Sequence, residues 1–240
     1  MLIQLIFLFF LLFFVFFLAL KISTYIYSAV FLLTKNKNIA VGVLVFFLLP
    51  GTIIHEFSHL IIATLLRVPT GELTILPTIE KNGEVRAGRL MLGKSDPFRH
   101  SLIGLAPMII GLTLIYLVGK LFIPNLNLLT THNSQLTTIF GFYLLFITSI
   151  TMFSSKKDLE SLIISIPITI LAIFSLYIIG VRVFLELDLV EKASSLLADL
   201  NYFLLLTAAV DYLIFFFLSL IIYLLQKILK RRSFFYKLSF

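Results

Sequence analysis

The chemistry that this sequence can support centres on His55, Glu56 and His59, which stand together in one apolar segment. They form the pattern HExxH. On a helix, residues i and i+4 lie on one face about 6 Å apart, so both imidazoles can reach a single tetrahedral metal ion. Glu56 lies about 100° around the same helix, where its carboxylate can take a proton from a water molecule that the metal activates. The pattern predicts His55 and His59 as metal ligands and Glu56 as the catalytic base.

The spacing is unlikely to be accidental. With 4 His and 7 Glu among 240 residues, a random order would produce HExxH on the order of two times in a thousand. Three ionisable groups within one turn and a half of a membrane helix are also costly unless a partner compensates them. The chain has no Cys, so a metal must be held by His and carboxylate ligands. We expect one Zn²⁺ per chain.

The rest of the sequence indicates that this site lies in a bilayer. Hydrophobic residues make up 60% of the chain and charged residues 13%, and the mean hydropathy is +1.10. Apolar segments long enough to cross about 30 Å of hydrocarbon favour helices. The prediction is an all-α polytopic membrane protein forming one domain over residues 1–240. The six expected membrane segments are 2–20 (with helix extending to 33), 40–66, 101–123, 135–153, 161–182 and 202–226.

Two features at the ends of these segments complete the expected architecture. The first segment lacks a basic leading stretch and a small-residue cleavage site, so we interpret it as a retained anchor. Residues 68–99 form the longest polar stretch. Within it, 73–80 and 84–91 have the composition of short strands joined near Asn82-Gly83, a dipeptide typical of tight hairpin turns. We expect a small β-hairpin after the second helix.

The distribution of basic residues predicts an orientation. Cytoplasmic termini place residues 67–99, Lys156 with Lys157 and the basic tail on one side, which collects 13 of the 19 basic residues. An acidic turn with Glu186, Asp188, Glu191 and Asp199 is then external. The formal charge of +7 is explained by this orientation in the cytoplasmic membrane, and we expect no nucleic-acid partner.

These motifs together resemble a known family. HExxH in an apolar helix, followed by a hairpin-like loop and a helix with Gly-Leu-Ala-Pro at 104–107, is similar to the site-two proteases, which are intramembrane zinc metalloproteases. That family takes its third ligand from the Asp of an NxxPxxxxDG motif. The corresponding residues here are 150–159, which keep Asp158 but have Ile150, Phe153 and Leu159 at the Asn, Pro and Gly positions. The resemblance implies Asp158 as the third zinc ligand.

Two acids compete for this third position. Asp158 follows a membrane segment on the face toward which the His59 end of its helix points, because the helix ends near Arg67, about 12 Å beyond His59. Asp158 could equally be a solvated turn residue. Asp211 is an acid within an apolar segment, which by default suggests a function. His100 and His132 are not expected to be ligands.

The expected function is an intramembrane zinc-dependent endopeptidase that hydrolyses peptide bonds of membrane-anchored protein or peptide substrates. Three alternatives remain open from the sequence. They are a membrane zincin whose third ligand is a Glu such as Glu160, a non-catalytic pseudoprotease that binds clients, and a metal-binding transporter subunit. The intact Glu56 argues against a pseudoprotease, and the scarcity of intramembrane acids argues against a transport path.

Overall fold

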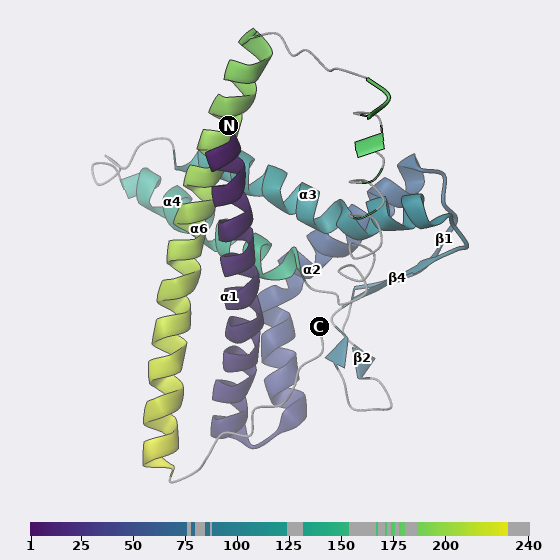
Figure 1. Ribbon diagram of the computed structural model, residues 1–240. Coiled ribbons are helices and arrows are strands. Elements are labelled where there is room, and N and C mark those ends of the chain that lie inside the picture. The colour runs from purple at the N-terminus through teal and green to yellow at the C-terminus, as the bar shows by residue number, and fades with distance from the viewer. Residues whose placement is uncertain are drawn as a thin grey trace.

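The computed structural model describes residues 1–75, 78–79, 85–86, 88–123, 132–153, 167, 171, 174–175, 178–180 and 187–229. Within them the chain is mostly helical, with five long helices and a small hairpin between the second and third (Figure 1). This confirms the predicted helical class and the position of the hairpin. The predicted membrane segment at 161–182 lies largely outside the described residues.

Helices α1 (Leu2–Thr34) and α2 (Lys37–Leu65) are joined by a tight turn. Lys35 adopts φ 55°, and its N–H donates to the Phe31 carbonyl at 2.8 Å, which ends α1. The Asn36 side chain then accepts hydrogen bonds from the amides of Asn38 and Ile39 and starts α2. The turn therefore folds the first half of α2 back along α1.

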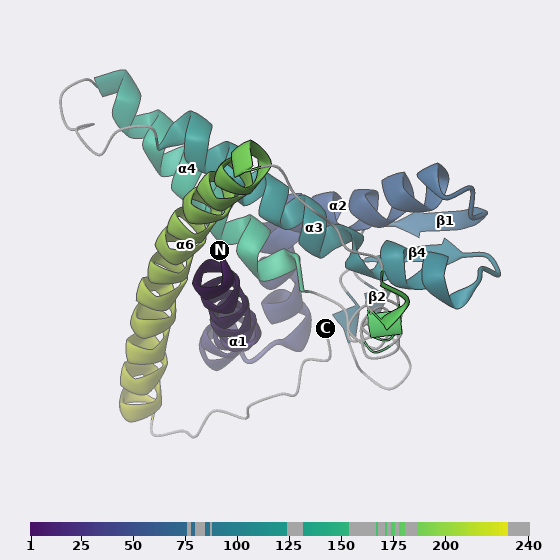
Figure 2. The same ribbon diagram turned by 45° about the horizontal axis from the view of Figure 1, so that its top comes forward.

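Helix α2 changes direction near its middle. Figures 1 and 2 show its first turns beside α1 and its last turns leading away toward the hairpin. Pro50 lies within the helix and removes one backbone N–H, which is the usual cause of a bend. The bend separates a first half that packs on α1 from a second half that carries His55, Glu56 and His59.

Helices α3 (Pro97–Phe122) and α4 (His132–Thr151) run antiparallel to each other. Helix α3 lies beside the second half of α2, and the end of α4 meets α2 near the bend. Helix α3 starts earlier than the sequence predicts, because Asp96 caps it by accepting a hydrogen bond from the Arg99 amide at 3.0 Å. That hydrogen bond, together with the Arg99 charge, lowers the pKa of Asp96. Small residues let the helices approach: an added Cβ at Gly111 on α3 would lie 2.8 Å from the Met152 Cβ, just beyond the end of α4.

Helix α6 (Leu187–Ile228) is longer than the predicted segment 202–226. The predicted acidic turn is wrong for Asp188, Glu191 and Asp199, which lie on this helix. Their carboxylates do not prevent helix formation because partners compensate two of them. Lys192 Nζ lies 2.7 Å from Asp188 one turn away, and Lys120 on α3 lies 2.7 Å from Asp199.

Helices α1 and α6 pack side by side and run in the same direction (Figure 1). Near their starts, Gln4 Oε1 accepts a hydrogen bond from Ser194 at 3.0 Å, and the Gln4 carbonyl accepts one from Asn201 at 2.9 Å. Near their ends, Ala29 and Leu32 pack against Ile222. Met1 and Ile228 therefore lie at opposite ends of this pair. The arrangement does not support the prediction that both termini face the same side.

Two antiparallel strand pairs form the hairpin. Strand β1 (Thr70–Thr74) pairs with β4 (Arg89–Leu92), and β2 (Thr78–Ile79) pairs with β3 (Val85–Arg86). The predicted strand pairing is confirmed, although the Asn82-Gly83 turn lies outside the described residues. The hairpin base packs on Ala63 of α2 and Ile103 of α3 through Val68 and Leu92.

Four described helices, α1, α2, α3 and α6, are long and apolar enough to cross a membrane, and α4 has a shorter apolar part, Leu136–Thr151. Their outward surfaces carry many exposed large apolar side chains, such as Phe9, Phe13 and Phe216. A bilayer is the natural environment for such surfaces. These features favour a membrane protein, whereas six membrane helices are not confirmed.

The parallel arrangement of α1 and α6 predicts a specific cross-linking pattern. Because the native chain has no Cys, paired substitutions can be read without background. Gln4→Cys with Ser194→Cys should cross-link efficiently with a short thiol reagent, since the native side chains are hydrogen-bonded. Gln4→Cys with Gln226→Cys is the matched control and should not cross-link. Efficient linkage of the control pair instead would show that the two helices are antiparallel.

Candidate metal centre

The second half of α2 buries all three residues of the HExxH motif. His55, Glu56 and His59 are 3%, 6% and 7% exposed. Thr52 and Ser58, also buried, donate their hydroxyls to backbone carbonyls of the preceding turn, at Leu48 and Ile54. These bonds use up the hydroxyl hydrogens of Thr52 and Ser58 within α2 itself.

The two imidazoles face each other through their Nε2 atoms, which lie 3.2 Å apart. Their rings are nearly perpendicular, at 85°, with centroids 4.8 Å apart. Two nitrogen ligands at the usual distances from a tetrahedral zinc ion are separated by about 3.3 Å. The His55 and His59 pair therefore fits zinc in spacing and in donor chemistry.

The orientation of His59 is fixed by α3. Its Nδ1 lies 2.8 Å from the carbonyl oxygen of Ile103. A carbonyl can only accept, so Nδ1 carries the hydrogen and a neutral His59 presents its lone pair at Nε2. This is the arrangement that metal-binding histidines generally have, with the second nitrogen held by a neighbouring acceptor.

The Ile103 carbonyl can serve this role because of Pro107. In an α-helix the amide of residue 107 would donate to the carbonyl of residue 103, but proline has no N–H. Pro107 lies inside α3 and is buried, so it leaves the Ile103 carbonyl without its helical donor. Sequence reasoning identified Pro107 as part of the Gly-Leu-Ala-Pro segment and as a residue that bends its helix, and it missed the carbonyl that Pro107 frees.

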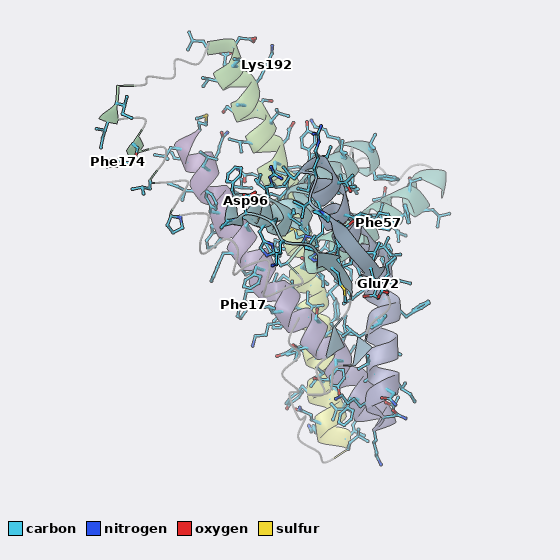
Figure 3. The ribbon with its side chains drawn as sticks, turned by 90° about the vertical axis from the view of Figure 1, so that its right-hand side faces the viewer. Phe17, Phe57, Glu72, Asp96, Phe174 and Lys192 are labelled. Carbon is cyan, nitrogen blue, oxygen red and sulfur yellow. The ribbon has the colours of Figure 1, made fainter. Side chains whose placement is uncertain are left out.

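The hairpin covers Glu56. Gly88, just before β4, lies so close that an added Cβ would be 2.6 Å from Glu56 Oε1 and 2.9 Å from Cδ. Figure 3, which views the molecule from the hairpin side, shows Phe57 of α2 and Glu72 of β1 on this face. A residue with a side chain at position 88 would displace the Glu56 carboxylate, so the glycine is required by this close approach. Gly88 was not singled out from the sequence.

A complete set of metal ligands is not found within the described part of the chain. No group of three or more His, Asp or Glu side chains there is arranged to hold a metal ion. Asp158 and Glu160 lie outside the described residues. His100 is exposed at the start of α3, and His132 is the first residue of α4. The structure thus brings together His55, Glu56 and His59.

The end of α4 nevertheless lies against α2, close to the HExxH motif. An added Cβ at Gly51 would be 2.6 Å from Thr151 Cγ2 and 2.9 Å from the Ile147 carbonyl oxygen. Gly51 is one turn before His55. The described chain continues to Phe153. Asp158 lies five residues beyond Phe153, outside the described part of the chain.

Asp211 lies on the other side of α4. It is fully buried, and its Oδ2 is 2.8 Å from the Ser149 hydroxyl. Ser149 is two residues from both Ile147 and Thr151, which places it about 200° around α4 from the face that meets Gly51. Helix α4 therefore separates Asp211 from α2.

Comparison with known proteins adds no relative to this description. No protein-family model, curated protein or solved structure matches the chain. The interpretation of the centre consequently depends on its own geometry.

Zinc binding is the first expectation from this geometry. The purified protein should hold about one zinc per chain, and His55→Ala or His59→Ala should each lose it, because each removes one of the two facing nitrogens. Metal analysis after gel filtration provides the measurement, with His100→Ala as the matched control that keeps the metal. Full zinc occupancy in the double mutant His55→Ala/His59→Ala would contradict the assignment.

Pro107→Ala should weaken zinc binding without touching a ligand. The new alanine amide competes for the Ile103 carbonyl and loosens the hydrogen bond that orients His59. We expect a zinc affinity lower by roughly 10-fold, the smaller end of the usual effect of a lost supporting bond. Competition titration with a chelator measures it. Zinc affinity equal to that of the unchanged protein would show that the freed carbonyl has no part in the site.

Proposed function

We propose that this chain is an intramembrane zinc-dependent endopeptidase that hydrolyses peptide bonds of membrane-anchored protein substrates. The observation that carries the proposal is the pair of buried imidazoles with Nε2 atoms 3.2 Å apart, adjacent to buried Glu56 on an apolar helix. The similarity of its motifs to the site-two proteases points the same way. Asp158 is the proposed third ligand.

A zinc ion held by these residues would supply Lewis-acid activation of a water molecule and of the substrate carbonyl. Glu56 accepts a proton from the attacking water and returns it to the leaving nitrogen as the peptide bond breaks. Burial beneath Gly88 keeps this carboxylate close to the centre and limits its contact with bulk water. The Ile103 carbonyl keeps His59 in the required tautomer throughout.

The substrate must reach this site in an extended form. A membrane helix hides its carbonyls in internal hydrogen bonds, and lipid offers no replacement for them once the helix unwinds. The hairpin next to Glu56 offers such replacements, because a two-stranded pair has unpaired backbone groups along its outer edges. We propose that the unwound substrate segment pairs with the hairpin and places its scissile carbonyl at the centre.

The membrane arrangement belongs to the same proposal. The chain is multi-pass, with α1, α2, α3 and α6 among the helices that cross the bilayer and residues 68–99 facing the cytoplasm. The long apolar helices and the basic residues of the hairpin segment support it.

Glu56→Gln should separate metal binding from catalysis. The amide keeps the shape of the side chain but cannot accept the proton from water. Zinc content should remain about one per chain, whereas cleavage of a membrane-anchored reporter should fall by at least about 100-fold. Cleavage at the unchanged rate would remove Glu56 as the base, and loss of zinc together with activity would show that Glu56 is itself a ligand.

Asp158→Ala should weaken zinc binding by at least about 100-fold, more than the loss of a supporting bond causes. Asp211→Asn is the matched comparison and should leave the zinc affinity unchanged, because α4 lies between Asp211 and α2. Competition titration with a chelator measures both. The reverse pattern would move the third ligand to Asp211, and loss only in Glu160→Ala would move it to Glu160.

A further inference from the structure

Asp211 is an acid with no place in the proposed reaction. It lies in α6, is fully buried and contacts α4 through Ser149. Among the described residues its Oδ1 atom has no hydrogen-bond partner. A buried carboxylate with one oxygen unsolvated is unfavourable in an apolar bundle, whereas a neutral carboxylic acid leaves only a weak acceptor unused.

The hydrogen bonds of Ser149 indicate which form is present. Its Oγ lies 2.7 Å from the Phe146 carbonyl oxygen and 2.8 Å from Asp211 Oδ2. A serine hydroxyl has one hydrogen, while a carbonyl and an ionised carboxylate can only accept. If Asp211 were ionised, one of these two short contacts would join two acceptors with no hydrogen between them. A protonated Asp211 donates to Ser149 Oγ, whose own hydrogen goes to Phe146, so both contacts become hydrogen bonds.

Charged neighbours do not offset this conclusion. Helices α1, α3 and α4 pack against α6. The cluster around this level contains apolar side chains from α1 and α4, including Leu18, Ile22 and Ile150. The titratable groups nearest to this level are Lys21, Tyr25 and Tyr27 on α1, Tyr116 and Lys120 on α3, Tyr143 on α4 and Tyr212 on α6. The Tyr25 ring stacks on Phe215, one turn after Asp211, and the Tyr27 ring stacks on Phe31.

None of these groups forms a hydrogen bond or ion pair with Asp211 within the described part of the chain. Lys21 is exposed with its Nζ 5.5 Å from the Phe17 ring, and Tyr212 is half-exposed. Tyr116 and Lys120 contact Phe203 and Asp199, which lie two to three turns before Asp211 on α6. Tyr143 lies six residues before Ser149 and is partly exposed. Asp211 consequently has Ser149 as its polar contact there.

We propose that Asp211 is a protonated carboxylic acid whose hydrogen bond to Ser149 holds α6 against α4. This hydrogen bond, called the clasp below, positions the end of α4 that leads to the metal centre. Loss of its proton to a base in alkaline solution leaves a carboxylate facing Ser149, and the clasp opens. The second half of the proposal rests on the proposed function, because the opposite face of α4 meets Gly51 one turn before His55. Asp211 is then a positioning residue and not a catalytic one.

Infrared difference spectra between the unchanged protein and Asp211→Asn test the protonation directly. At neutral pH the carbonyl stretch of a protonated carboxylic acid should be present in the unchanged protein and lost in the variant. A difference that shows only carboxylate bands would overturn the proposal. The same spectra recorded on metal-free His55→Ala protein should give the same band, so this readout does not depend on zinc or on peptidase activity.

A spin-label distance between α4 and α6 tests the clasp. Phe140→Cys and Leu205→Cys provide half-exposed attachment points, and the native chain contributes no Cys. The distance should shift to longer values when the pH is raised into the alkaline range. With Asp211→Asn added it should stay short at every pH, because the amide donates to Ser149 and has no proton to lose. Opening of the Asp211→Asn protein with an identical pH profile, or no opening of the unchanged protein after its acid band disappears, would each overturn the clasp.

The peptidase assay then separates this proposal from the proposed function. Cleavage by Asp211→Asn should persist at alkaline pH values where the unchanged protein has lost activity, and zinc content should be equal in the two. Absence of cleavage in both proteins, with the acid band and the distance change intact, would overturn the proposed function and leave the protonated acid standing. Loss of activity at the same pH in both proteins would show that Asp211 does not position the metal centre.

Discussion

The hydrogen bond between His59 Nδ1 and the Ile103 carbonyl is the constraint on which the candidate centre depends. It joins α2 to α3 at the ring nitrogen opposite the one that faces His55, so the tautomer of His59 depends on how these two helices pack. The acceptor exists because Pro107 withdraws the amide that an ordinary helix would supply to it. The helical hydrogen bond that Pro107 removes thus leaves free the acceptor that orients His59.

The other elements hold that contact in place through close approaches at small residues. Gly51 lets α2 meet Thr151 and Ile147 of α4, and Gly111 lets α3 meet Met152. The end of α4 therefore packs against both α2 and α3, the two helices that the His59 hydrogen bond joins. Gly88 brings the hairpin onto Glu56 from outside. Because lipid provides little hydrophobic drive between helices, close packing of this kind is the main force that can fix their geometry.

Much of this could be predicted from the sequence because it depends on local pattern. HExxH spacing places two imidazoles on one helical face, and their nitrogens do face each other. The strand-like composition of the segments on either side of Asn82-Gly83 predicted the strand pairing. Hydropathy located most helices, but it missed the first turns of α6, where partners compensate the acidic side chains Asp188 and Asp199.

The features that could not be predicted are those set by contacts between distant segments. The parallel packing of α1 and α6 depends on Gln4 meeting Ser194 and Asn201, which no hydropathy or charge count contains. The approach of Gly88 to Glu56 is likewise a tertiary contact. The Ile103 carbonyl is an intermediate case. Pro107 indicates from the sequence that this carbonyl lacks its helical donor, but only the fold shows that His59 donates to it.

The common direction of α1 and α6 imposes a parity rule on the whole chain. If both helices traverse the bilayer, the chain leaves α1 on the far side and must be back on the near side at Leu187. An odd number of traversals must then occur between them, in a part of the chain that includes residues outside the described ranges. Met1 and Ile228 would then lie on opposite sides of the bilayer, so a partner that binds the start of α1 and a partner that binds the end of α6 would meet the protein in two different compartments.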